Sequence, residues 1–158
     1  MGPTYAGFDP RDSRCDSVYR YCQARGVPIL FHVGTTYNRL APLGLSRPWL
    51  WDEVAINYPD LRMVLAHVGH PFCDECLVVI RKHPHVYADI AALFYRPWQF
   101  YNMMISAQEY QVTHKLLFGT DYPHQVHDMK GSMANTAALP GDVCQAIREG
   151  NARAVFRL

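Results

Sequence analysis

Four ionisable side chains stand at the ends of apolar segments, where a folded chain can place chemistry. His32, His67 and Asp89 close three such segments, and Asp121 directly follows a fourth. A carboxylate immediately after a buried strand is costly to desolvate unless another group compensates its charge. Two imidazoles and a carboxylate on one rim are suitable ligands or auxiliaries for a divalent metal. Such a metal lowers the pKa of its bound water to about 7 and makes hydroxide available at neutral pH.

The elements that must position these side chains are four apolar runs, which we interpret as β-strands. The first two runs do not alternate between apolar and polar residues, which is typical of parallel strands covered on both faces. The four runs are VPILFHV (27–33), LRMVLAHV (61–68), HVYADI (85–90) and KLLFGT (115–120).

Predicted helices separate and flank these strands. Asp12 or Ser13 can cap a first helix, Gly26 ends it, and Pro97 opens a later one. The helices are expected over residues 13–25, 49–58, 72–83 and 97–111, with one or two more within 140–158. This alternation predicts an α/β fold with a parallel sheet and right-handed crossovers. Because the carboxyl ends of parallel strands lie on one side, the four ionisable side chains are expected to converge there.

The composition indicates an ordinary globular chain without a dominant electrostatic partner. Its 158 residues suit a single domain over 1–158, and a hydrophobic content of 49% is enough for a sizeable core. The 15 basic and 14 acidic residues leave a formal net charge of +1. That charge creates no field that would attract nucleic acid or an anionic membrane. No apolar run approaches the roughly 20 residues that a membrane span needs.

The cysteines indicate a reducing compartment. Their number, 5, is odd, and the first residues, MGPTYAGFDP, contain neither the basic nor the apolar region of a secretory signal. We therefore expect reduced thiols and a cytoplasmic location. Cys73 and Cys76 match the pattern Cys-x-x-Cys, which fits a zinc or redox site. No second cysteine pair accompanies them, so two independent thiols on a helix are the favoured interpretation.

Five strings of the sequence carry a resemblance to a known family. VPILFHVG, LRMVLAHVGHPF, HPHVYADI, KLLFGTDYP and GNARAVFRL occur in this order. They resemble the second half of the amidohydrolase-related family, a group of metal-dependent TIM-barrel hydrolases and decarboxylases. The resemblance extends from about Phe8 to the last residue. It implies half of a TIM (β/α)8 barrel, built from four strand-helix units.

The resemblance also implies roles for the residues at the strand ends. His32 matches a metal-ligand histidine of the family, and His67 matches a histidine that binds or orients the metal-bound water or the substrate. Asp121 matches an aspartate that ligates the metal and shuttles protons. The implied cofactor is a divalent metal, zinc in the first place with manganese as the alternative, and the implied partner is a small-molecule substrate. Taken singly, His32 and His67 also fit core histidines with satisfied polar atoms.

The sequence departs from the family pattern in one large respect. A first strand with a His-x-His or Glu-x-His pair, which completes the family's metal site, is missing. His83 and His85 have the right spacing, but they precede the third strand and so lie at the opposite rim. Four strands of a barrel leave two unpaired edges and an exposed inner face, and both favour association. We therefore expect a homo-oligomer or a missing amino-terminal half, and a metal site with only two or three ligands.

Other residues near the expected rim have two interpretations each. His70 supports its neighbours or contacts substrate, and Arg96 clamps a substrate carboxylate or stays solvated. Asp89 orients a ligand or caps the turn that follows it. His124 and His127, on the loop after the fourth strand, enter the site or stay exposed. Four residues of the helix over 97–111 share one face and are expected in the core: Trp98, Tyr101, Met104 and Ile105.

Three functions remain open at this point. The first is a metal-dependent hydrolase that cleaves a C–O or C–N bond of a small carboxylate, ester, lactone or amide. The second is a metal-dependent decarboxylase of an aromatic or muconate-type acid. The third is a catalytically incomplete half-barrel that serves as an assembly or binding module. A flavodoxin-like nucleotide-binding sheet is disfavoured, because no glycine-rich phosphate loop follows any predicted strand.

Overall fold

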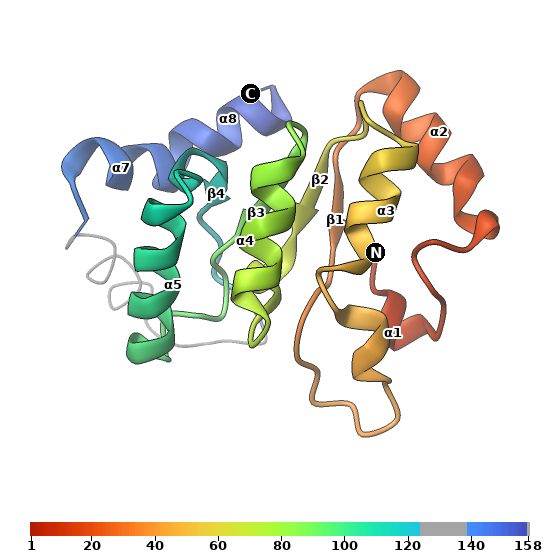
Figure 1. Ribbon diagram of the computed structural model, residues 1–158, viewed down its shortest axis with the longest axis horizontal. Coiled ribbons are helices and arrows are strands. Elements are labelled where there is room, and N and C mark those ends of the chain that lie inside the picture. Colours follow the sequence, from red (N-terminus) through yellow and green to blue (C-terminus); the bar gives the residue numbers. More distant parts are fainter. Residues whose placement is uncertain (124–138, 158) are drawn as a thin grey trace.

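A sheet of four parallel strands forms the centre of the protein. The structure is a computed structural model in which residues 1–123 and 139–157 are described. The strands are β1 (Ile29–Phe31), β2 (Met63–Leu65), β3 (Val86–Asp89) and β4 (Leu116–Leu117). They pair in chain order, β1-β2-β3-β4, and every pair is parallel (Figure 1). The predicted parallel α/β sheet is therefore confirmed, although each strand is shorter than its apolar run.

Helices connect the strands as the sequence predicts, with one addition at the start of the chain. The helices are α1 (Pro3–Ala6), α2 (Asp16–Arg25), α3 (Leu50–Asn57), α4 (Cys73–Lys82), α5 (Pro97–Glu109), α7 (Gly141–Gln145) and α8 (Asn151–Phe156). Gly26 ends α2 in the left-handed conformation at φ 62°, as expected for a helix stop. The short α1 was not predicted, because four residues around a proline give no periodic signal.

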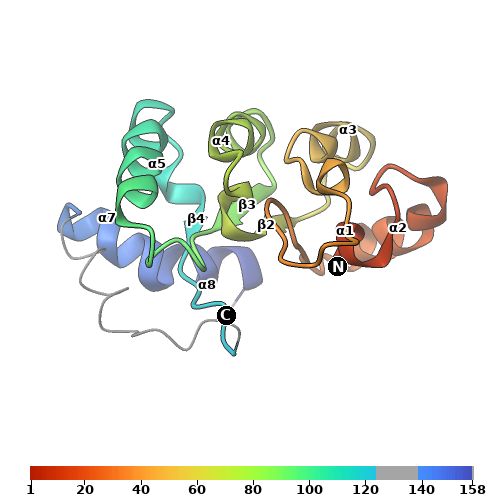
Figure 2. The same cartoon turned by 90° about the horizontal axis from the view of Figure 1, so that it is seen from below.

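The main core lies between the sheet and the helices α3, α4 and α5, which cover one face of it (Figure 2). Phe31, Met63 and Leu65 contribute the strand side of this core and are fully buried. Trp51 on α3 packs edge to face on Phe31, with ring centroids 5.5 Å apart. Apolar burial on this face is the main term that holds the strand ends, and therefore the rim, in place.

The carboxyl-terminal helix α8 partly covers the second face of the sheet. The sequence predicted a helix in this segment but not its position on the sheet. Figure 2 shows α7 and α8 on the side opposite α3, α4 and α5. Val64 and Leu117 pack there against Val155 of α8, and all three are buried. Leu30 of β1 stays 51% exposed on this face. The expectation of an exposed inner face is therefore wrong for β2 and β4 and holds only at β1.

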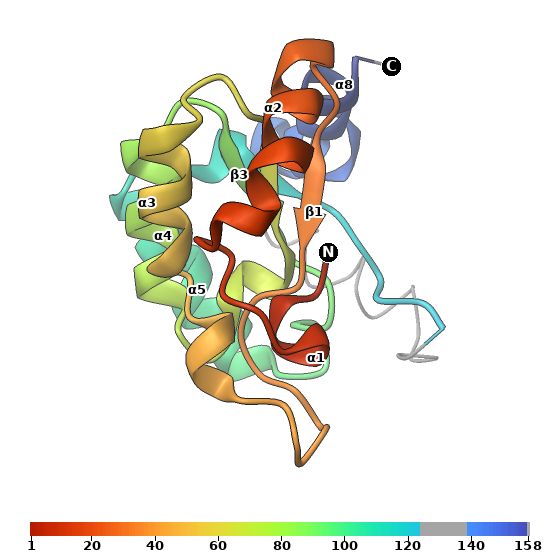
Figure 3. The same cartoon turned by 90° about the vertical axis from the view of Figure 1, so that its right-hand side faces the viewer.

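The amino-terminal segment runs beside the edge of β1 (Figure 3). The Met1 amino group donates to the Leu30 carbonyl at 2.5 Å, and the Met1 carbonyl accepts from the His32 amide at 2.8 Å. These two contacts extend the hydrogen bonding of the sheet by one residue beyond β1. They also bring α1 next to the end of β1, where His32 lies.

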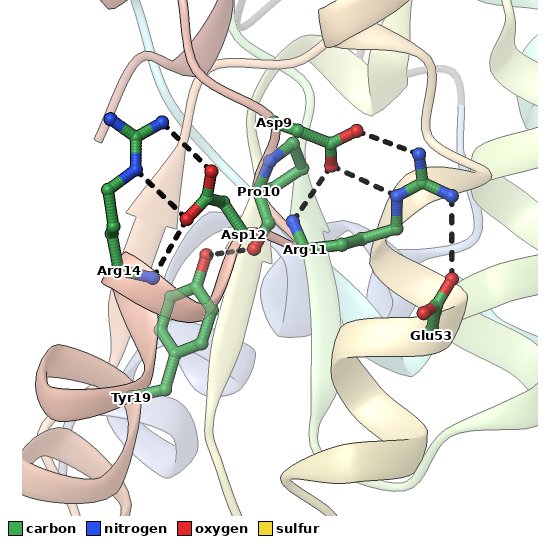
Figure 4. A network of polar contacts seen from close by, with 7 residues as sticks. All are labelled: Asp9, Pro10, Arg11, Asp12, Arg14, Tyr19 and Glu53. Carbon is green, nitrogen blue, oxygen red and sulfur yellow. Dashed lines mark hydrogen bonds and ion pairs between the residues drawn. The ribbon is translucent and has the colours of Figure 1, made fainter.

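The connection from α1 to α2 is held by short-range polar contacts, drawn in Figure 4. Asp9 pairs with Arg11 at 2.7 Å, and a second Asp-x-Arg pair follows directly in the same geometry. Such exposed pairs contribute little to stability, because water screens their attraction. The buried Tyr19 adds an anchor, because its hydroxyl donates to the Pro10 carbonyl at 2.8 Å. The segment thereby fixes where α1 lies relative to the core.

Candidate functional site

Three of the four ionisable residues predicted for the rim, His32, His67 and Asp121, line one cavity at the carboxyl ends of the strands, whereas Asp89 lines a neighbouring cavity. The cavity measures about 540 Å³, within the roughly 300–1,000 Å³ range of small-molecule sites. Its lining residues are Tyr5, His32, Thr35, Tyr37, Asn38, His67, His70, Ala92, Tyr95, Arg96 and Asp121. This set includes five candidate site residues from the sequence: His32, His67, His70, Arg96 and Asp121.

A sharp backbone turn follows each strand and aims these residues at the cavity. Gly34, His67, Ala92 and Asp121 each have a positive φ, at 90°, 61°, 57° and 61°. For residues other than glycine this conformation costs on the order of 1–3 kcal/mol and tends to occur at functional sites. At Gly34 a side chain is impossible, because a Cβ would lie 2.2 Å from the His70 carbonyl oxygen. The loops after β1 and β2 therefore meet in direct backbone contact.

His32 is held as a neutral imidazole with one free ring nitrogen. Its Nε2 lies 3.1 Å from the Thr35 carbonyl, which can only accept, so Nε2 carries the proton and Nδ1 is unprotonated. Burial lowers the pKa of His32 from its ordinary value, and the neighbouring His67 lowers it further. The Thr35 carbonyl and the charge of Asp121 act in the opposite direction on the pKa of His32 but are smaller causes. A neutral imidazole is the form that binds a metal ion.

His67 is oriented by the turn that follows β3. Its backbone amide donates to Asp89 Oδ1 at 3.0 Å, and its Nδ1 lies 3.2 Å from the Ala91 carbonyl. Asp89 Oδ1 also accepts the Ala91 amide at 3.0 Å. Asp89 therefore caps its own turn, as one of its two interpretations predicts, and it also holds the amide of His67. That Asp89 orients a ligand stays a prediction. The rings of His32 and His67 lie edge to face, with centroids 5.3 Å apart.

The donor types suit a divalent metal, but the described residues do not assemble a complete metal centre. Two imidazoles and one carboxylate belong to the preferred ligand set of zinc. Among residues 1–123 and 139–157, however, no group of three His, Cys, Asp or Glu side chains is arranged to hold a metal ion. A metal at His32 and Asp121 would therefore have two protein ligands from this part of the chain.

The His-x-His pair is engaged elsewhere, as its position in the sequence indicated. His83 Nε2 lies 2.7 Å from Asp52 Oδ1, so this imidazole joins α3 to the end of α4. Lys82 pairs with the same carboxylate at 2.7 Å. Neither His83 nor His85 lines the cavity that holds His32.

One wall of the cavity contains the groups suited to an anion. Tyr37 and Tyr95 place their hydroxyl oxygens 3.3 Å apart, and the Arg96 guanidinium lies 4.4 Å from the centre of the Tyr95 ring. The pKa of Tyr37 is lowered, first by the hydrogen bond with Tyr95 and then by the charge of Arg96. Arg96 also contributes, after burial, to the lowered pKa of the largely buried His70. A cation beside two hydroxyl donors is suited to a carboxylate.

Several lining residues were missed in the sequence. Tyr5 packs on His32 with ring centroids 4.7 Å apart, but it lies on α1, which gave no signal. Thr35 and Tyr37 belong to the loop after β1. Their only signal is their position directly after a strand that ends in a histidine.

A second cavity reaches the same three groups from the other side. It measures about 560 Å³ and lies between the sheet and α8. Its walls include Leu30, Val64, Leu117 and Phe156, and His32, His67 and Asp121 line it as well as the first cavity. The two imidazoles and the carboxylate are therefore reachable from both sides of the rim.

Some other expectations need correction or fall outside the described residues. The predicted core stripe on α5 is wrong for Trp98, Tyr101 and Ile105, which are 72%, 60% and 40% exposed, whereas Met104 is buried. The aromatic rings on that face of α5 thus face solvent in this chain. His124 and His127 lie outside the described residues.

The Cys-x-x-Cys pair consists of two separate thiols on α4. Cys73 and Cys76 are free thiols near the start of α4, and neither belongs to a candidate metal cluster among the described residues. Burial raises the pKa of Cys73 to about 12 and that of Cys76 well above its ordinary value. A thiol that stays protonated is a poor nucleophile and ligand.

Comparison with known proteins assigns the family. A profile of the family described as Amidohydrolase matches residues 1–158, so the chain belongs to the amidohydrolase family. No curated protein matches the sequence. Its four parallel strands alternating with helices are a partial TIM barrel, as in the solved structures that it resembles.

Three of these structures illustrate the relationship. An uncharacterized TIM-barrel protein from Bordetella bronchiseptica is 22% identical, with a TM-score of 0.77 over 95% of this chain and 52% of that one. A dihydroxybenzoic acid decarboxylase from Polaromonas was solved with bound manganese and the inhibitor 2-nitroresorcinol. It is 15% identical, with a TM-score of 0.69 over 96% of this chain and 56% of that one. An amidohydrolase from Burkholderia multivorans, with bound zinc, is 15% identical, with a TM-score of 0.67 over 93% of this chain and 58% of that one. This chain spans about half the length of these structures.

No helix among the described residues is both long enough and apolar enough to cross a membrane.

Proposed function

We propose that this chain contributes the metal- and substrate-binding rim of a metal-dependent hydrolase. The substrate is a small carboxylate, ester, lactone or amide, and the bond cleaved is C–O or C–N. The observation that carries the proposal is that His32, His67 and Asp121, far apart in the sequence, line one cavity together with Arg96. Membership of the amidohydrolase family supports the same reaction class.

Each residue that lines the cavity has a role in this proposal. His32, through its unprotonated Nδ1, and Asp121 would hold the metal, zinc in the first place with manganese as the alternative. When bound, a divalent metal supplies a water of lowered pKa at neutral pH. Asp121 takes the proton as the water oxygen adds to the acyl carbon. The C–O or C–N bond then breaks, and the leaving oxygen or nitrogen receives that proton. His67, which lines the same cavity, would bind or orient the water or the substrate through its Nε2.

Arg96 and His70 orient the substrate in this proposal. The guanidinium binds a substrate carboxylate in two parallel hydrogen bonds, and the Tyr95 ring beneath it limits its rotation. His70 is neutral and largely buried beside it, so it supplies a donor or an acceptor without a competing charge. The substrate's reacting group then lies toward the histidines and its acid group toward Arg96.

Decarboxylation of an aromatic or muconate-type acid is the second candidate, and the similarity to a manganese-containing decarboxylase favours it. In that reaction the C–C bond to the carboxylate breaks, carbon dioxide leaves, and an acid of the site protonates the carbon. The same residues serve both reactions. A non-catalytic half-barrel is the third candidate, supported by the absence of a three-residue metal cluster in the described part of the chain.

One experiment separates these functions. The purified protein is loaded with zinc or manganese and incubated with panels of esters, lactones, amides and hydroxybenzoates. Hydrolysis of esters or lactones lowers the pH without releasing carbon dioxide, whereas decarboxylation releases carbon dioxide and consumes a proton. Turnover that is lost in Asp121→Asn supports an enzyme. If the chain neither binds the metals nor turns over any compound, the result contradicts both enzyme functions and supports the non-catalytic half-barrel.

We further propose that the chain associates, with a second copy or with an amino-terminal half, and that it resides in a reducing cytoplasm. Beyond Met1 no described residue pairs with the free edge of β1, and none extends the sheet beyond β4. Unpaired edges favour association. All five cysteines are free thiols, which supports the compartment. Light scattering at micromolar concentration tests the association, and a well-folded monomer contradicts it.

A further inference from the structure

We propose that Asp89 is a positioning residue, which holds His67 in a left-handed backbone conformation and thereby presents the Nε2 atom of His67 to the ligand. The role of His67 toward a ligand rests on the proposed function. The positioning itself concerns only this chain's own contacts, so it can be tested without substrate or metal.

The backbone at His67 needs an external restraint. His67 has φ 61° and ψ 21°, Val68 has φ 45° and ψ 31°, and Gly69 continues with φ 63°. Only glycine adopts this region without strain, and a β-branched residue such as Val68 is especially unfavourable there. Such a conformation persists only when surrounding contacts determine it.

Asp89 supplies that restraint from the neighbouring strand. Its Oδ1 accepts the amide of His67 at 3.0 Å and the amide of Ala91 at 3.0 Å. The strands β2 and β3 pair up to Leu65 and Ala88, so Asp89 stands directly beside the point where the chain leaves β2. One buried carboxylate oxygen therefore joins the turns that follow two adjacent strands. Hydrogen bonds to a carboxylate are stronger than those between neutral groups.

The same turn fixes the imidazole. The His67 Nδ1 lies 3.2 Å from the Ala91 carbonyl, which accepts a hydrogen bond but cannot donate one. In a neutral imidazole the proton is therefore on Nδ1, and Nε2 keeps its lone pair. Asp89 Oδ1 is 4.0 Å from Nδ1, beyond hydrogen-bond distance, so it acts on the ring through the backbone and through its charge. A carbonyl or carboxylate that fixes the opposite ring nitrogen is how proteins orient metal-binding histidines.

The test measures the ring and the amide of His67 directly. In ¹⁵N-labelled protein, long-range proton–nitrogen spectra report which ring nitrogen carries the proton, and His67→Gln assigns the signals. We expect the Nδ1-protonated form and a slowly exchanging His67 amide in the unaltered chain. In Asp89→Ala we expect a mixture of ring forms and amide exchange at least about tenfold faster, as for the loss of one charged hydrogen bond. Asp89→Asn keeps an acceptor oxygen, so it should retain most of the amide protection.

Asp52→Asn is the matched control, because Asp52 also contacts a histidine but lies between α3 and α4. It should shift the signals of His83 and leave those of His67 unchanged. An Nε2-protonated His67 in the unaltered chain overturns the proposal even if Asp89→Ala does not fold. A folded Asp89→Ala with unchanged ring form and amide exchange also overturns it. Either result leaves the proposed function standing, because metal binding and turnover are measured separately.

Discussion

The imidazoles of His32 and His67 lie edge to face with their ring centroids 5.3 Å apart. One follows β1 and the other follows β2, and the backbone contact between the two loops holds them together. The Thr35 amide donates to the His70 carbonyl at 2.6 Å, and Gly34 packs against the same carbonyl. Each ring has a carbonyl on one nitrogen, which leaves the other nitrogen of each available. Both rings line the cavity that Asp121 also lines.

Removal of a predicted ligand should weaken metal binding in solution. We expect His32→Ala to lower zinc affinity by at least about tenfold, because changes to residues that only support ligands already cost about 10–100-fold. Calorimetric titration of the metal-free protein measures this effect. Asp52→Asn, which alters a carboxylate outside the cavity, should bind zinc like the unaltered chain. Equal affinity in His32→Ala would remove His32 from the site.

Gly34→Ala should destabilise the fold strongly. The φ of 90° is unfavourable for alanine, and the new Cβ would lie 2.2 Å from the His70 carbonyl oxygen and 2.6 Å from the Gly69 carbonyl carbon. We expect a loss of at least about 2 kcal/mol in the free energy of unfolding, as for other strained positions.

The matched control is Gly44→Ala, because a Cβ at Gly44 meets nothing within 4 Å. It should change the free energy of unfolding by no more than about 0.5 kcal/mol. Chemical denaturation compares the two variants. Similar stability of both would show that the loops after β1 and β2 are not in close contact.

Lys115→Met should also destabilise the protein. Lys115 lies at the amino end of β4, away from the cavity. The ammonium group is buried and donates to the carbonyls of Ile80 at 2.8 Å, His83 at 2.5 Å and Pro84 at 3.2 Å. Without it these carbonyls lose a shared donor, for which we expect a cost of about 1–3 kcal/mol.

Lys82→Met is the control for this change, because Lys82 is exposed and forms a single ion pair with Asp52. Exposed pairs contribute about 0–1 kcal/mol, so this variant should be nearly as stable as the unaltered chain. Urea denaturation at pH 7 measures both. An Lys115→Met protein as stable as Lys82→Met would contradict the bridging role of Lys115.

Stability should fall as the pH is lowered below about 6.5. Burial lowers the pKa of His70 below its ordinary value of 6.5, with the charges of Arg96 and His67 as further causes. The unfolded chain therefore binds a proton that the folded chain releases, so the free energy of unfolding rises with pH up to about 6.5 and then levels off. One such proton contributes at most about 1.4 kcal/mol per pH unit.

His70→Gln should reduce this slope without abolishing it, because the pKa of His32 is lowered in the same direction. Thermal unfolding between pH 5.5 and 7.5 measures the slope. If His70→Gln loses as much stability at low pH as the unaltered chain, burial of the neutral His70 imidazole does not cause the pH dependence.

One geometric rule was sufficient to predict which side chains gather at one cavity. Parallel strands all end on the same side, so His32, His67 and Asp121 had to approach one another once the four apolar runs were recognised as strands. The direction of individual side chains was beyond that rule. The side-chain direction depends on the left-handed backbone conformation at His67 and Asp121. No sequence pattern predicts a positive φ at a histidine or an aspartate.

The misses have physical causes as well. Helical spacing placed Trp98 and Tyr101 on one face of α5, but periodicity alone cannot say whether that face meets a core or solvent. The position of α8 across the second face of the sheet arises from long-range contacts, such as Val155 with Val64. Tyr5 reaches His32 through α1, whose four residues are too few to show a pattern.

The central claim is that His32 and Asp121 share one metal ion. The most direct measurement is anomalous diffraction at the zinc edge from crystals of this protein grown with stoichiometric zinc. The account predicts a peak in the cavity within about 2.0–2.2 Å of a His32 ring nitrogen and an Asp121 carboxylate oxygen. A zinc peak elsewhere, or full occupancy at another site with none here, would contradict it.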